Sequence, residues 1–346
     1  MEMITITVFV FNPRAARRRL PIWEYKVMRT RSGVLAVALP LAAALLASAC
    51  SSSSSSSSAA GGSSTAAAAS ASKIVAIGAE NEYADVISQI GGKYVNAEAI
   101  MSNPNTDPHT FEASPAVARE VSAAQLVVQN GVGYDTFMST IESADPSSGR
   151  KVINAQQLLG LPDSTPNPHL WYKPTTMPAV ASAVAADLAQ LDPAHAAYFK
   201  ANAASFIASL SAWNSAIAAF KADYPDVPVA TTEPVADYTL QALGADNLTP
   251  WTLQADIMNG VDPSPQNVAA QDALFNDHKV KVFVYNQQVT DTLTESFIQL
   301  AEKNGIPVVG VYETMPTPGY DYQSWMLAEV NALKKAVTDK ISTQKL

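Results

Sequence analysis

Short apolar runs rich in Ile and Val alternate with amphipathic stretches from residue 73 onward. The first run is followed by an amphipathic stretch over 82–90 that ends at two glycines. A β-branched run, a helical period and a glycine stop predict a strand and then a helix. The apolar runs of this half are 74–77, 126–128 and 152–153. Since helical stretches separate them, we expect residues 73–191 to form an N-terminal α/β domain with a parallel sheet.

The second half of the chain repeats this alternation. Its apolar runs are 227–230, 280–285 and 306–311, with helical stretches over 265–275 and 292–304 between them. The same reasoning predicts a C-terminal α/β domain over 223–346.

A helix of unusual length is predicted between the two domains. Asp192 provides a capping residue and Pro193 occupies the first helical position, which proline favours. Large apolar residues then recur at helical spacing: Phe199, Phe206, Leu210, Trp213, Ile217 and Phe220. One helix over 192–222 would be about 45 Å long at ~1.5 Å per residue, enough to join both domains and restrict their hinge motion. A coiled-coil face for a partner is the alternative. The predicted fold class is therefore α/β, with two parallel-sheet domains joined by one long helix.

The N-terminal segment has a different composition. Arginines near Met28 precede an almost unbroken apolar stretch over 34–49, and small residues lead into Cys50. This pattern resembles a bacterial lipoprotein signal, in which the cysteine becomes the acylated N-terminus. We expect a signal segment over 1–49, with Met28 as an alternative start, and lipidation at Cys50. A transmembrane anchor is the alternative, but the stretch is shorter than the ~20 residues that span hydrocarbon.

Residues 50–72 consist almost entirely of Ser, Ala and Gly, a composition that has little to bury. We expect this stretch to be a flexible tether that carries the lipid.

Composition narrows the classes of function. The chain has 346 residues and a formal net charge of -9, which suits two domains that each bury a core. An acidic protein repels phosphate backbones, and the one arginine-rich run, 17–19, precedes the expected signal stretch, so we expect no nucleic-acid partner. Cys50 is the only cysteine. Any metal site must therefore use histidines and carboxylates.

Two of the four histidines share a local pattern. His109 and His169 each follow a proline in a turn-like segment, which restricts the backbone and presents the imidazole from a loop. The pattern alone leaves two readings open: a pair of metal ligands, or two unrelated turn histidines. His195 and His278 lie in ordinary polar surroundings and are expected to have no role in a site.

The segments around these histidines resemble those of a known family. Residues 105–115 look like the first-histidine segment of the zinc/manganese ABC-transporter solute-binding lipoproteins, and 167–172 look like the second. Residues 130–135 are similar to the turn that follows the second strand of this family. The resemblance covers about 73–340 and implies a metal site in the cleft between two domains, with His109 and His169 as ligands.

The resemblance also implies two acidic ligands. Glu233 matches the third, and its position supports this independently, because open α/β sheets bind ligands at the carboxyl ends of their strands. An ordinary glutamate at a helix N-terminus is the alternative. Glu313 matches the fourth, with Asp321 in reserve and a solvated post-strand carboxylate as the alternative.

The implied function is a monomeric, extracytoplasmic lipoprotein, anchored to the cell membrane by lipid. It captures one divalent transition metal, Mn²⁺ or Zn²⁺, as transported ligand and delivers it to the membrane subunits of an ABC permease. Two imidazoles and two carboxylates, with no third histidine, favour Mn²⁺ modestly, although intrinsic affinities rise towards Zn²⁺. No enzymatic activity is expected. The alternatives are an adhesin-like surface lipoprotein and a secreted metal-dependent hydrolase, but the sequence has no H-E-x-x-H motif.

Overall fold

The computed structural model describes residues 72–105 and 107–346. The expected signal segment, Cys50 and the tether up to residue 71 lie outside the described residues.

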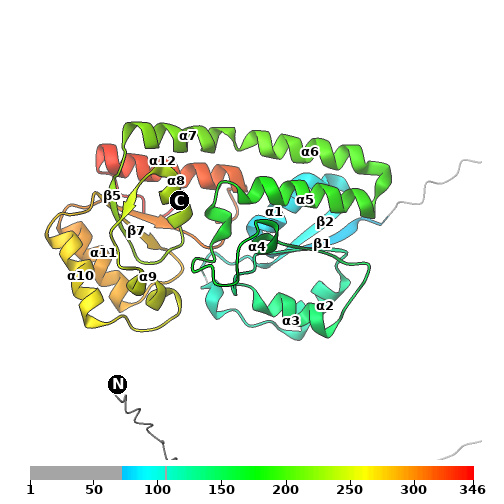
Figure 1. Cartoon of the computed structure of the whole chain (residues 1–346), viewed down its shortest axis with the longest axis horizontal. Coiled ribbons are helices and arrows are strands. Elements are labelled where there is room, and N and C mark those ends of the chain that lie inside the picture. The colour runs from blue at the N-terminus through cyan, green and yellow to red at the C-terminus, as the bar shows by residue number, and fades with distance from the viewer. Residues whose placement is uncertain (1–71, 106) are drawn as a thin grey trace, which may run out of the picture. The chain divides into compact units, whose positions relative to one another are not determined.

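The first lobe is built on a parallel four-stranded sheet in the order β2-β1-β3-β4, of which Figure 1 labels β1 and β2. Its strands are β1 (Ile74–Glu80), β2 (Val95–Met101), β3 (Leu126–Gln129) and β4 (Lys151–Asn154). Its helices are α1 (Asn81–Gly91), α2 (Pro115–Ala123), α3 (Thr136–Ala144), α4 (Ala155–Leu158) and α5 (Thr176–Leu191), with 3₁₀ turns η1 (Gly92–Tyr94), η2 (Pro108–Thr110) and η3 (Leu170–Tyr172). The sequence pattern did not predict β2, because this edge strand exposes Asn96 and Glu98 and lacks a continuous apolar run.

The second lobe repeats the arrangement, with a parallel sheet in the order β6-β5-β7-β8. Its strands are β5 (Pro228–Thr231), β6 (Asp246–Asn247), β7 (Val282–Asn286) and β8 (Val308–Val311). Its helices are α8 (Asp237–Leu243), α9 (Trp251–Met258), α10 (Pro265–Asn276), α11 (Thr292–Lys303) and α12 (Tyr322–Asp339). Two parallel α/β sheets are thus confirmed.

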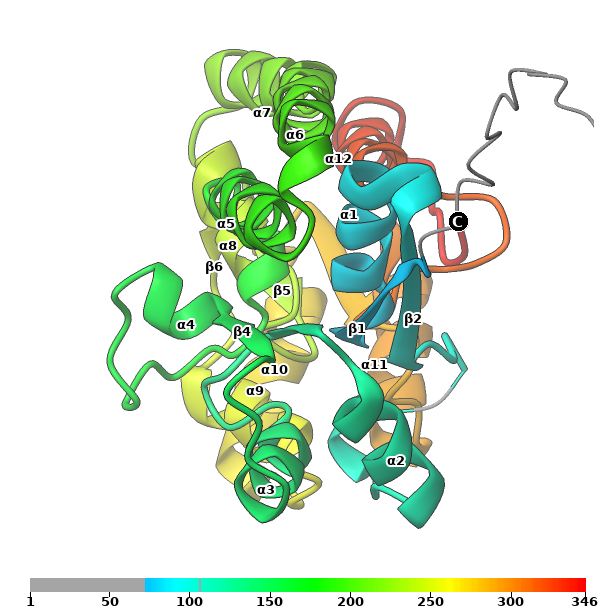
Figure 2. The same ribbon diagram turned by 90° about the vertical axis from the view of Figure 1, so that its right-hand side faces the viewer.

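A helical run of 31 residues, Pro193–Asp223, lies between the two lobes in the chain. It consists of the 3₁₀ turn η4 (Pro193–His195), α6 (Ala196–Ser209) and α7 (Ser211–Asp223), with the helix interrupted at Leu210. Figures 1 and 2 show this run along one side of both lobes, beside α5 and α12. All six large apolar residues that predicted the helix are buried: Phe199, Phe206, Leu210, Trp213, Ile217 and Phe220. Inward packing therefore replaces the coiled-coil alternative.

Among the described residues this is also the one helix whose length and composition would suffice to cross a membrane. Its large side chains instead belong to a core that continues from α1 and α5 of the first lobe to β5, β8 and α12 of the second. Because close packing spans the two lobes, large hinge motions between them would expose apolar surface and are disfavoured.

Glu329 of α12 lies in this shared core, where it links the two lobes. Trp325 donates its indole N–H to Glu329 Oε1 at 2.8 Å, and the Tyr172 hydroxyl lies 2.9 Å from the same oxygen. The Tyr172 hydroxyl also donates to the carbonyl of Tyr312 at 2.7 Å. Burial disfavours the charged carboxylate and raises the pKa of Glu329 to about 8, despite these hydrogen bonds.

Replacing Glu329 by glutamine should make the protein relatively more stable as pH rises. A carboxyl whose pKa is raised on folding contributes full stability only below its unfolded pKa, and loses this contribution as pH rises through about 8. Glutamine stays uncharged throughout. The free energy of unfolding of Glu329→Gln minus that of the wild type should therefore increase between pH 5 and pH 9, by up to a few kcal/mol. Urea denaturation across this range measures it, with the exposed Glu295→Gln as control. A difference from wild type that does not vary with pH would contradict the assignment.

Candidate metal centre

His109 is presented by a short, rigid turn. It lies in η2, after the end of β2, where Pro108 occupies the first position. The Asp107 carboxylate caps the turn by accepting the His109 backbone N–H at 2.8 Å. The side chain of His109 keeps 20% of its surface exposed, so it reaches from the turn towards the interior without leaving solvent completely.

His169 is completely buried, and the amide of Asn167 fixes its orientation. Asn167 Oδ1 accepts the His169 backbone N–H at 3.0 Å and lies 2.8 Å from Nδ1 of the ring. Asn167 Nδ2 donates to the carbonyl of Pro234 at 2.7 Å, which identifies Oδ1 as the oxygen. Nδ1 of His169 is therefore directed at Asn167, which leaves Nε2 as the ring atom that faces Glu313.

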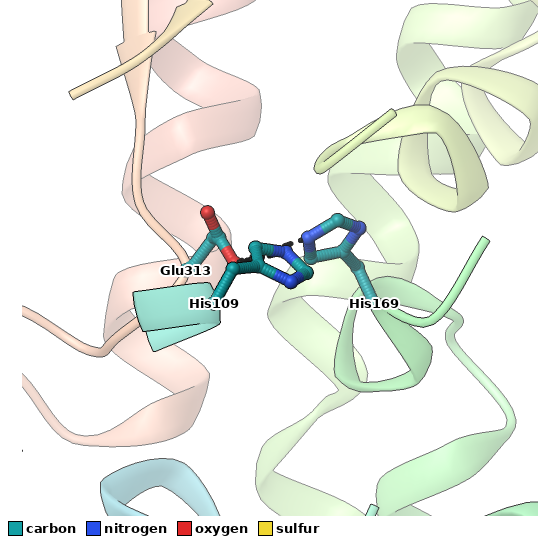
Figure 3. Close-up of side chains that lie close together, drawn as sticks. All are labelled: His109, His169 and Glu313. Atoms are coloured by element: carbon teal, nitrogen blue, oxygen red, sulfur yellow. Dashed lines mark hydrogen bonds and ion pairs between the residues drawn. The ribbon is translucent and has the colours of Figure 1, made fainter. Parts of the chain in front are cut away.

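Glu313 brings the two histidines together. It follows β8 and is fully buried, and its Oε2 lies 3.2 Å from Nε2 of His109 and 3.2 Å from Nε2 of His169 (Figure 3). Donor atoms of the three side chains all lie within 4.8 Å of one another, the one such group of three or more among the described residues. Two donors of a tetrahedral zinc ion at its usual bond lengths lie about 3.3 Å apart. The trio is therefore spaced as metal ligands are.

Two neighbours hold the carboxylate of Glu313. Tyr134, from the turn after β3, donates its hydroxyl to Glu313 Oε2 at 2.9 Å. Asn286, the last residue of β7, donates its amide to Oε1 at 2.6 Å. The Gln288 side chain accepts the backbone N–H groups of Glu313 and Thr314 at 2.7 and 2.8 Å. These contacts fix both the side chain and the backbone of Glu313 between the lobes.

Glu233 lies beside the trio and not within it. It follows β5 and is buried, and its Oε2 accepts the Asn286 amide at 3.2 Å. Its Oε1 is buried and has no hydrogen-bond partner in the described part of the chain. A buried carboxylate oxygen without a partner is costly unless a ligand or a proton satisfies it. The structure thus places Glu233 next to the predicted ligands without bringing its carboxylate into their contact.

The other residues considered from the sequence lie elsewhere. Asp321 caps the N-terminus of α12, where its carboxylate accepts the Ser324 N–H and is exposed. His195 pairs with Asp192 at 2.6 Å and stacks on Tyr94, and His278 occupies a turn with positive φ. Cys50 lies outside the described residues.

The pKa values of the site follow from burial and from the charges in contact. Burial alone would lower the pKa of His109, but the contact with Glu313 and the charge of Asp107 raise it above the ordinary value. Burial lowers the pKa of His169 below its ordinary value. For Glu313, contact with both histidines outweighs burial and holds its pKa well below the usual range. Burial, and then the charge of Glu313, raise the pKa of Glu233. The trio therefore combines an ionised carboxylate with two imidazole nitrogens.

Sequence reasoning did not assign roles to Tyr134, Asn286 or Asn167. Tyr134 and Asn167 lie within the two motif segments, but only their contacts show what they hold. Asn286 offered a weak signal, because it is a polar residue at the end of an apolar strand, and polar residues there face the ligand-binding edge of the sheet.

Comparison with known proteins identifies similar sequences and structures. A sequence profile of the family described as zinc-uptake complex component A, periplasmic (ZnuA), matches residues 78–336. The manganese-binding lipoprotein MntA of Bacillus subtilis is 25% identical over 129 residues, which cover 36% of this chain and 42% of that protein. The chain thus spans less than half the length of this relative, and 49% of a metal ABC transporter lipoprotein of Streptococcus cristatus.

Solved structures share the fold. The periplasmic zinc-binding protein TroA of Treponema pallidum has a TM-score of 0.65 at 16% identity, over 78% of this chain and all of that one. FpvC of Pseudomonas aeruginosa in complex with Mn²⁺ has a TM-score of 0.62 at 22% identity, over 78% and 99% of the two chains.

Proposed function

Since the chain belongs to the zinc-uptake complex component A family, we propose that it captures one divalent transition-metal ion outside the cytoplasm and delivers it to the membrane subunits of an ABC permease. The observation that carries the proposal is the contact of His109, His169 and Glu313 between the lobes. Three segments remote in sequence present two imidazoles and one carboxylate to a single point, and each would supply one donor atom to the ion. The family consists of solute-binding proteins, so the hydrolase alternative is set aside.

The proposed ligand set includes Glu233 as a fourth residue. Its unpartnered Oε1 and its position at the end of β5, beside Glu313, support this. Two neutral imidazoles and two ionised carboxylates would balance the charge of a divalent cation. Burial, and then the charge of Glu313, raise the pKa of Glu233, and a bound cation would favour its ionised form.

The proposed cargo is Mn²⁺ or Zn²⁺. A relative is named for manganese, and TroA, which shares the fold, is named for zinc, and both names support the proposal. Nitrogen and carboxylate donors accept either ion, whereas the absence of a thiolate in the site removes one common source of zinc preference.

The proposed location is the outer face of the cell membrane. Several relatives are named as lipoproteins, and the pattern around Cys50 supports a lipid anchor after removal of residues 1–49. In this proposal, 50–72 is the lipidated tether, 73–191 and 223–346 are the two domains, and 192–222 is the helix that joins them. The protein acts as a monomer on the surface of its permease.

Titration of the purified protein with Mn²⁺ and Zn²⁺ tests the proposed function. We expect one ion per chain, and we expect His109→Ala and His169→Ala each to weaken binding by at least about tenfold, because each removes a donor that no neighbour can replace. His195→Ala is the matched control, since this histidine lies outside the site. Isothermal titration calorimetry measures affinity, and thermal melts of the metal-free proteins establish that they are folded. Unchanged affinity in either site variant would remove that histidine from the site.

A further inference from the structure

A single side-chain amide joins the two carboxylates of the proposed site. Asn286 is buried at the carboxyl end of β7. Its Nδ2 donates to Glu313 Oε1 at 2.6 Å and to Glu233 Oε2 at 3.2 Å. A side-chain NH₂ group has two hydrogens, so it satisfies one oxygen of each glutamate.

The orientation of this amide is fixed by its surroundings. Asn286 Oδ1 accepts the backbone N–H of Gln288 at 2.9 Å, so Nδ2 must face the carboxylates. The backbone N–H of Asn286 donates to the Thr232 hydroxyl at 3.0 Å, which ties the end of β7 to the segment that carries Glu233. The amide therefore cannot turn away from the glutamates without losing a buried hydrogen bond.

The contacts of Asn286 decide which carboxylate oxygens remain available. In Glu313 the amide takes Oε1 and leaves Oε2, the oxygen that faces both histidines. In Glu233 the amide takes Oε2 and leaves Oε1, the buried oxygen for which residues 72–105 and 107–346 provide no hydrogen-bond partner. Tyr134 donates its hydroxyl to Glu313 Oε2 as well, which helps to hold that oxygen where it faces the histidines.

We propose that Asn286 is a specificity-determining positioning residue that restricts Glu233 and Glu313 to one metal-binding oxygen each. This inference rests on the proposed function and predicts which of the two metals the site prefers. Two imidazole nitrogens and two single oxygens make a four-coordinate site, which Zn²⁺ accepts as its ordinary geometry. Mn²⁺ favours more oxygen donors, which bidentate carboxylates would supply. Asn286 thereby favours Zn²⁺ over Mn²⁺. Without it, both carboxylates could bind with two oxygens each, which would suit Mn²⁺ better.

Asn286→Leu tests this by removing both donors while keeping a side chain of similar size. Because loss of a residue that orients ligands costs about 10- to 100-fold in metal affinity, we expect Zn²⁺ binding to weaken by at least about tenfold. Mn²⁺ binding should change much less, because freed carboxylates compensate with further oxygens. Competition titrations give the Kd for Mn²⁺ divided by the Kd for Zn²⁺. This Kd ratio should fall by about tenfold or more in the variant. X-ray absorption of the Mn²⁺-loaded proteins should show more oxygen neighbours in the variant than in the wild type.

Gln271→Leu is the matched control. Gln271 is a fully buried amide of the same lobe, and its hydrogen bond within the described part of the chain goes to the Thr231 carbonyl at 3.0 Å and not to a glutamate. Its loss tests the general cost of removing a buried amide, and the Kd ratio should stay at the wild-type value. Asn286→Asp is a second variant that keeps the acceptor for Gln288 and replaces the donors by a carboxylate, and it should shift the ratio in the same direction as Asn286→Leu.

The outcomes separate this inference from the proposed function. Equal losses for both metals in the Asn286 variants, with an unchanged coordination number, would show a merely structural role and overturn the inference while leaving metal capture intact. Unchanged affinities for both metals would overturn it as well. A wild-type protein that binds neither ion at one equivalent would overturn the proposed function, and the inference with it.

Discussion

Glu313→Gln should weaken the binding of both Mn²⁺ and Zn²⁺ by more than about a hundredfold, beyond the range expected for residues that only orient ligands. Its Oε2 lies 3.2 Å from Nε2 of each histidine, and these contacts hold the pKa of Glu313 well below the usual range. Glutamine keeps the volume but removes the negative charge. It also leaves an amide at the point where the cation would lie, so the site loses a donor and part of its charge balance.

Calorimetric titration measures this loss, with Glu295→Gln on the exposed face of α11 as the same substitution away from the site. The metal-free variant should still unfold cooperatively, because the cores of the two lobes do not depend on this carboxylate. Binding within threefold of the wild type would remove Glu313 from the ligand set and leave Glu233 as its acidic member. Asp321 would not be the next candidate, since it caps α12 at the surface.

Metal should raise the melting temperature more at pH 7.5 than at pH 5.5. Contact with Glu313 raises the pKa of His109 above its ordinary value of about 6.5. His109 is then largely protonated at pH 5.5, and the ion must displace that proton. For a group of pKa 6.5 or higher this weakens apparent affinity by about tenfold or more at pH 5.5, equivalent to about 1.4 kcal/mol. His169 contributes less than His109, because burial lowers its pKa below the ordinary value.

A melt is a sensitive reporter of this effect. A ligand that binds only the folded state stabilises it by about 2.7 kcal/mol at a hundredfold excess over Kd. The comparison uses the difference between melting temperatures with and without metal at each pH, so that other titrating groups such as Glu329 cancel. His195→Ala should show the wild-type dependence on pH. Equal metal-induced shifts at both pH values would count against histidine ligation.

The predictions from sequence succeeded where the physical cause is local. A strand or helix can be predicted from the spacing of apolar side chains within its own sequence. The apolar runs at 74–77, 227–230 and 306–311 all lie in or next to strands of the two sheets. The stripe from Phe199 to Phe220 faces the core for the same reason. The turns of His109 and His169 are likewise local, since each depends on a proline and on a neighbouring Asp107 or Asn167.

The meeting of the site residues could not be predicted in this way. Glu313 lies 144 residues after His169 and 179 residues after Tyr134. Which side chains share the space between the lobes depends on strand order, on the ends of β5, β7 and β8, and on the packing of the long helix against both lobes. Resemblance to a family suggested Glu313 and Glu233, but not that Asn286 joins them.

The sequence by itself thus determined the elements, their alternation, and the turns that present His109 and His169, because these follow from the side chains of consecutive residues. Only the tertiary structure decided that Glu313 contacts both histidines, whereas Glu233 is linked to Glu313 through the side-chain amide of Asn286. The physical reason is that a buried carboxylate is held by the donors that the fold brings within hydrogen-bond distance, and these come from segments remote in sequence. For these two glutamates the donors come from Asn286 at the end of β7 and from Tyr134 in the other lobe.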